Sequence, residues 1–97
     1  IHHARLADVR LTIAEIWRVL APHAIAFVTV AGSTHPGEPY EEIEPGTFVP
    51  LSGPEQGLPH HIFSEAELCH ELRAFHIDEI SYRAEGKVLA AWLTRPA

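Results

Sequence analysis

The chain has 97 residues, of which 46% are hydrophobic, and its formal net charge at pH 7 is −6. This length and composition suit one small folded domain and exclude a disordered chain. Thirteen acidic residues against seven scattered basic ones argue against a nucleic-acid or anionic-membrane surface, because phosphate binding relies on clustered lysine and arginine.

The first expected element is an amphipathic helix from about Ala7 to Leu20. Apolar residues recur there at spacings of three and four, which marks one face of a helix, and Pro22 ends the pattern. The run from Ala24 to Ala31 is apolar without polar alternation, which predicts a strand buried on both faces, as in parallel sheets. Neither run is long enough to span a bilayer.

A long connection from Gly32 to Pro59 follows this strand. Its six prolines and five glycines exclude a long helix. A connection of this length inside a compact domain is usually functional or disordered. Apolar residues along it favour an ordered flap, with a short strand around Thr47 to Val49.

A capping box opens the C-terminal part of the chain, with Ser64 as the N-cap and Glu67 at the third helical position. It predicts a helix from about Glu65 to Ala74. This helix contains Cys69, the one cysteine, which excludes an intrachain disulfide and favours a reducing, cytoplasmic setting.

Two strands are expected to complete the chain. The first starts at Phe75 with an imperfect alternation near residues 78–79, and the second covers residues 88–93. The turn-forming residues 85–87 lie between them, which predicts an antiparallel hairpin.

Two segments resemble class I S-adenosylmethionine-dependent methyltransferases of the small-molecule type. They are "EIWRVLAP" with the strand after it, and "GTFVPLSGPEQGLPHHIFSEAEL" with the helix and hairpin after it. The resemblance implies an α/β fold that corresponds to the C-terminal half of a Rossmann-like sheet: helix, strand, long loop, helix and β-hairpin. It also implies a mixed sheet whose last strand runs antiparallel between the other two. The family's two glycines after the proline are replaced by His23 and Ala24.

The resemblance also bears on the cofactor. The family binds S-adenosylmethionine with a glycine-rich loop after its first strand and an acidic residue after its second, and neither is found in this sequence. Residues 1–97 are therefore expected to form a single domain, the C-terminal portion of a methyltransferase lacking the cofactor-binding half. The complete enzyme would bind S-adenosylmethionine and methylate a small molecule, whereas this chain alone would not hold the cofactor.

Four residues are candidates for the functional site. His60 and His61 close the long loop, and the resemblance implies that one imidazole orients the substrate or acts as a base; alternatively, His60 packs against the loop and His61 is solvated. Tyr40 starts an acidic stretch that either contacts a cationic substrate or is solvated. His3 would follow the family's fourth strand, beside the cofactor.

The eight histidines raise the question of a metal site. The segment from His70 begins like the zinc motif H-E-x-x-H, but Ala74 stands where the second ligand belongs, and His76 is too far along to share the helix face. No metal site is therefore expected.

The alternative to a methyltransferase segment is a non-catalytic oligomerising module derived from the same fold. A strand over residues 24–31 without a neighbour on one side would expose an apolar edge, which is a template for association. A homo-oligomer, most simply a homodimer, is expected through this edge. Trp17 and Phe27 are expected in the core, and Trp92 in the core or at an interface.

Overall fold

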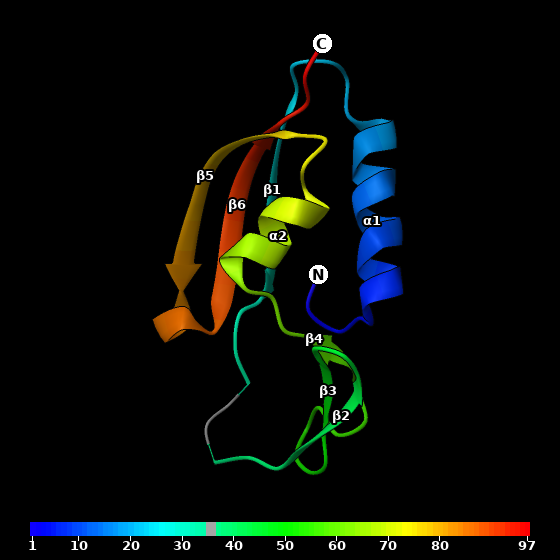
Figure 1. Cartoon of the computed structure of the whole chain (residues 1–97), viewed down its shortest axis with the longest axis vertical. Helices are drawn as coiled ribbons and strands as arrows, with labels where there is room; N and C mark the ends of the chain where they lie inside the picture. The colour runs from blue at the N-terminus through cyan, green and yellow to red at the C-terminus, as the bar shows by residue number, and fades with distance from the viewer. Residues whose placement is uncertain (35–36) are drawn as a thin grey trace.

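A computed structural model describes residues 1–34 and 37–97. The elements in chain order are α1 (Leu6–Val19), β1 (Ile25–Ala31), β2 (Tyr40–Glu44), β3 (Thr47–Pro50), β4 (His60–His61), α2 (Glu65–Glu71), β5 (His76–Arg83), a 3-10 turn (Ala84–Gly86) and β6 (Val88–Thr94). They form two three-stranded sheets, a larger one in the order β1-β6-β5 and a smaller one in the order β2-β3-β4 (Figure 1). Within the described ranges, no helix is both long and apolar enough to cross a membrane.

The larger sheet has β6 at its centre, antiparallel to both neighbours. This is the position that the resemblance implied for the last strand. The expectation of a mixed sheet is wrong for the described part of the chain, since every strand pair there is antiparallel: β1 and β5 run the same way, but β6 separates them. The irregular alternation near Asp78 is a register shift between Ile77 and Glu79.

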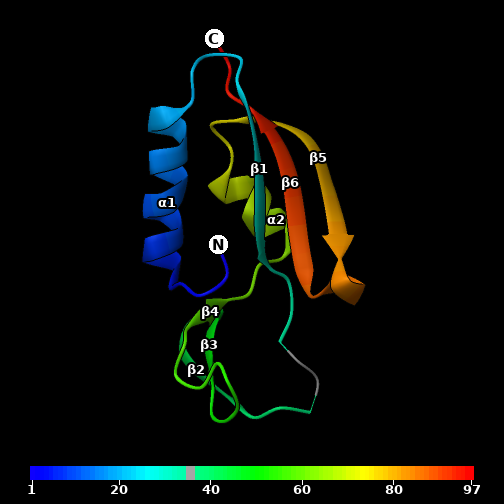
Figure 2. The same cartoon turned by 180° about the vertical axis from the view of Figure 1, so that it is seen from behind.

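One face of the larger sheet is covered by helices. Helix α2 lies across it and α1 lies beside β1, an arrangement that Figures 1 and 2 show from opposite sides. The core fills the space between them, and it consists of Val9, Ile13, Val28, Val30, Phe63, Leu68, Leu72, Phe75, Leu89, Ala91 and Leu93. Trp17 packs against this core with its ring edge-on to Phe75, as its helical spacing predicts.

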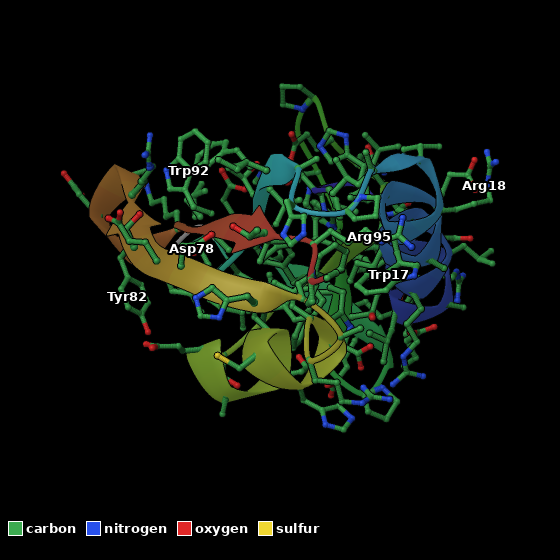
Figure 3. The ribbon with its side chains drawn as sticks, turned by 90° about the horizontal axis from the view of Figure 1, so that it is seen from above. Trp17, Arg18, Asp78, Tyr82, Trp92 and Arg95 are labelled. Carbon is green, nitrogen blue, oxygen red and sulfur yellow. The ribbon has the colours of Figure 1, made fainter. Side chains whose placement is uncertain are left out.

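The other face of the larger sheet carries exposed aromatic side chains. Phe27 is 40% exposed and Trp92 is 43% exposed, and their ring centroids are 4.6 Å apart. Figure 3 shows Trp92 on the side of the sheet away from α2. The prediction of a strand buried on both faces is therefore wrong, as is the placement of Phe27 in the core, because none of the described elements covers this face.

The outer edge of β1 is partly occupied. The carbonyl oxygen of Thr29 accepts a hydrogen bond from the amino group of Ile1 at 2.7 Å, and that of Ala31 accepts one from the Phe63 N–H at 2.9 Å. Alternate residues of a strand bond to the same side, so both carbonyls belong to the edge away from β6. The part of this edge left for another strand lies at residues 25–27, where Ile25 is 64% exposed.

The turn between α1 and β1 is made without the family's glycines. His23 takes the left-handed conformation, with φ 68°, that glycine adopts more easily, and its N–H donates to the carbonyl of Arg95 at 2.7 Å. The Arg95 guanidinium also donates to the Leu20 carbonyl and lies 4.5 Å from the centre of the Trp17 ring (Figure 3). The C-terminal end of β6 is thereby attached to the last turn of α1.

The ion pair between α1 and α2 predicts a pH-dependent stability. Arg10 donates to both carboxylate oxygens of Glu71, whose side chain is only 7% exposed, and this hydrogen bonding lowers the pKa of Glu71. A carboxyl group whose pKa is lowered by folding stabilises the folded state at pH values above the ordinary pKa of glutamate. This stabilisation is lost as the pH falls through the pKa of the group in the folded state. Arg10→Ala should therefore be less stable than the wild type in urea at pH 7, and the difference should shrink as the pH falls through the lowered pKa of Glu71. A difference independent of pH would contradict the assignment.

Candidate functional site

The long loop predicted as a flap folds into the smaller sheet. Strand β3 confirms the short strand expected at residues 47–49, and it pairs with β2 on one side and β4 on the other. Gly46, at the turn between β2 and β3, has φ 79°, and a Cβ atom there would meet the His61 ring at 3.0 Å. The tight approach of this turn to β4 therefore requires glycine.

His61 connects the smaller sheet to α2 through its two ring nitrogens. Its side chain is 1% exposed, with Nδ1 at 2.7 Å from the Thr47 hydroxyl and Nε2 at 2.9 Å from a Glu67 carboxylate oxygen. The N-cap is as predicted, because the Ser64 hydroxyl accepts a hydrogen bond from the Glu67 N–H at 3.1 Å. Solvation of His61, one of the two alternatives from the sequence, is excluded.

A cavity of about 350 Å³ lies at the carboxyl end of β1. Its wall combines the residues before α1, the end of β1, the smaller sheet and the β5–β6 turn; the lining residues are His2, His3, Ala31, Ser33, Thr34, Tyr40, Glu55, His60, Ile62, Ala84, Lys87 and Val88. In open α/β sheets, ligands bind at the carboxyl ends of strands. The cavity is therefore the candidate functional site.

Two histidines and a glutamate form one side of this cavity. Glu55 contacts His3 Nε2 through one carboxylate oxygen at 3.0 Å and His60 Nε2 through the other at 2.9 Å. The two imidazole rings lie edge to face, with centroids 4.8 Å apart. The hydrogen bond from His3 is the main cause of a lowered pKa for the Glu55 carboxyl group, which is therefore an anion at neutral pH.

The rest of the wall is mixed in polarity. His2 Nε2 lies 3.0 Å from the Thr29 hydroxyl, and partial burial lowers the pKa of His2. The Tyr40 hydroxyl donates to Glu38 at 3.4 Å. Lys87 adds a cation from the β5–β6 turn. The site thus offers donors and acceptors of hydrogen bonds around a partly apolar space, which suits a small polar molecule.

Three of the four residues predicted for the site line this one cavity. They are His3, Tyr40 and His60, whereas the side chain of His61, the other residue of β4, contacts Glu67 of α2 and is not among the lining residues. The sequence reasoning did not find Glu55, which lies between two prolines and matches no motif. Its role emerges only from the fold, because 52 residues separate it from His3.

Comparisons with known proteins support the fold. No protein-family profile matches the chain, and no curated protein matches it. A solved structure, that of Burkholderia thailandensis 1,6-didemethyltoxoflavin-N1-methyltransferase with bound 1,6-didemethyltoxoflavin and S-adenosylhomocysteine, is similar with a TM-score of 0.67 and 20% sequence identity. The similarity covers 99% of this chain and 40% of that one, so the chain spans less than half the length of its structural neighbour. The chain therefore has the fold of part of a methyltransferase.

Proposed function

We propose that residues 1–97 form the C-terminal, substrate-binding part of a cytoplasmic class I methyltransferase that transfers a methyl group from S-adenosylmethionine to a small molecule. The larger sheet would be the C-terminal half of a Rossmann-like sheet, and the smaller sheet a lid over the acceptor. The observation that carries the proposal is the fold similarity over 99% of the chain to a small-molecule methyltransferase.

The geometry of the cavity supports this assignment. Methyl transfer is an in-line displacement, so the protein's main task is to hold the acceptor atom in line with the sulfonium methyl group. Tyr40 and His60 line the cavity from the lid. The Tyr40 hydroxyl can bond to a polar group of an acceptor, and His60, whose ring nitrogens contact Leu58 and Glu55, would shape the wall and hold Glu55 in place. His3 comes from the residues before α1 and lies beside His60, and the resemblance implies that the cofactor of the complete enzyme would lie near it. His61 would act indirectly, by fixing the strand that carries His60.

The proposal is tested by cofactor binding. We would titrate S-adenosylhomocysteine calorimetrically into the 97-residue chain and into the longest translation product that contains it. The longer product should bind in the micromolar range and transfer a labelled methyl group to a small-molecule acceptor, and the 97-residue chain should not bind. Absence of binding by the longest product would overturn the proposed function.

Acceptor binding can be examined separately in the same product. His60→Ala should raise the KM for the acceptor about tenfold, which corresponds to about 1.4 kcal/mol of binding free energy, and leave the affinity for S-adenosylhomocysteine unchanged. His76→Ala is the matched control, because His76 is exposed on β5. An unchanged acceptor KM in His60→Ala would remove His60 from the acceptor site.

We also propose that the chain self-associates through residues 25–27 of β1, the part of the edge without a partner in the described chain. Sedimentation at high protein concentration should then show a species of twice the 10.8 kDa monomer mass. Ile25→Lys should shift the chain to monomer, because a charged side chain on an edge strand opposes pairing. Leu11→Lys, at an equally exposed position on α1, should not. A monomer at all concentrations would contradict this proposal.

A further inference from the structure

Both ring nitrogens of His60 face hydrogen-bond acceptors. Its Nδ1 lies 2.8 Å from the carbonyl oxygen of Leu58, which only accepts hydrogen bonds, so Nδ1 carries a proton. Its Nε2 lies 2.9 Å from a Glu55 carboxylate oxygen, which is also an acceptor. Either a ring proton or a bound cation can complete this second contact, so the pair is a candidate for metal binding.

The surroundings of this pair match a metal centre. His3 brings a second imidazole nitrogen to within 3.0 Å of the other Glu55 oxygen, and the three ligand atoms all lie within 4.8 Å of one another. A hydrogen bond from the second ring nitrogen of a histidine to a backbone carbonyl is the usual arrangement for a metal ligand, because it fixes the tautomer and the orientation of the ring. The contact of His60 with Leu58 has this form.

We propose that His3, Glu55 and His60 bind a divalent transition-metal ion of the zinc type. Two imidazoles and one carboxylate form a ligand set that zinc and related ions favour, and they leave at least one position for water or a bound molecule. At a tetrahedral ion, metal–ligand bonds of about 2.1 Å place the ligand atoms about 3.4 Å apart, so atoms that now lie within 4.8 Å of one another rearrange slightly on binding. His3, half-exposed before α1, supplies this adjustment by a change of rotamer.

Such a site would link three segments that are distant in the sequence. His3 precedes α1, Glu55 lies in the loop after β3, and His60 belongs to β4. The ion would therefore tie the smaller sheet to the residues before α1, at the wall of the proposed acceptor cavity. Because binding to the folded state alone raises stability, the metal should also raise the melting temperature. The test below requires no methyl transfer, so its outcome is separate from that of the proposed function.

The experiment is a titration of the chelator-stripped chain with Zn²⁺, followed by calorimetry, and with Co²⁺, followed by visible absorption. We expect one ion per chain and a rise in melting temperature. Glu55→Gln and His60→Gln should each weaken binding at least about tenfold and abolish the cobalt band. His76→Gln is the matched control: His76 lies 3.3 Å from Asp78, a two-ligand pair on the far strand, and its loss should change affinity less than twofold.

Several results would overturn the metal site. They are the absence of saturable binding, wild-type affinity in Glu55→Gln, or loss of binding in His76→Gln. Glu55 is 43% exposed, so Glu55→Gln is expected to fold, which circular dichroism checks. If His60→Gln fails to fold, Glu55→Gln decides alone.

Discussion

Phe63→Ala is expected to lower the free energy of unfolding by about 3–5 kcal/mol, the range for loss of a fully buried phenylalanine. The side chain is 2% exposed, and its ring lies edge-on to His61 with centroids 4.7 Å apart. Phe63 belongs to the core beneath α2, and its N–H binds the end of β1. Alanine would leave a cavity at the junction of both sheets. The loss is a large fraction of the total stability of a domain of this size.

The matched control is Phe27→Ala, which removes the same side chain from the exposed face of β1. Phe27 keeps 40% of its surface in water and contacts chiefly Trp92 and the Arg83 guanidinium. We expect a loss of less than about 1 kcal/mol, since little surface returns to water and no cavity forms. Urea denaturation of both variants measures the difference. Equal losses would show that the exposed face is covered in solution.

Thr47→Val is expected to cost about 1–3 kcal/mol, although valine has nearly the same shape as threonine. Thr47 is fully buried, and its hydroxyl lies 2.7 Å from His61 Nδ1 and 3.0 Å from a Glu44 oxygen. The hydroxyl donates its one proton to Glu44 and is also the partner of His61 Nδ1. Valine removes this hydroxyl and leaves a buried ring nitrogen without its partner.

Thr94→Val is the control for this change, because the Thr94 hydroxyl donates to Asp78 at the surface, where water can replace it. A change within about 0.5 kcal/mol is expected there. Thr47→Ser keeps the hydroxyl and should recover most of the loss. Thermal unfolding of the three variants at pH 7 measures these differences. Equal stability of Thr47→Val and the wild type would show that the hydrogen bond contributes nothing.

Local patterns predicted the elements whose structure depends on near neighbours. Spacings of three and four placed α1 within one residue of its observed bounds, and the Ser64 cap placed the start of α2 at Glu65. The hairpin of β5 and β6 followed from alternation and a short turn, including the irregularity near Asp78. In each case the controlling contacts lie within a few residues along the chain.

The features that sequence patterns missed depend on which segments lie side by side. An apolar strand such as β1 shows no alternation, so its composition predicts burial on both faces even though the described chain supplies a layer for one face only. Strands β2 and β4 are short and lie among prolines and glycines, and they form because β3 pairs with both. The grouping of His3, Glu55 and His60 is likewise a product of tertiary structure.

The hydrogen bond between Ala31 and Phe63 has a consequence for how this fold can change over evolution. The chain leaves the larger sheet at Ala31 and returns to it at Phe63, two positions in direct backbone contact at 2.9 Å. Residues 32–62 therefore form one continuous segment whose two ends are adjacent, and a short linker is enough to join those ends. An exchange of residues 32–62 for a different sequence would replace the smaller sheet and its side of the cavity while leaving β1, β5 and β6 intact. Under the proposed function, acceptor preference would then change by replacement of one continuous segment, with the rest of the domain inherited unchanged.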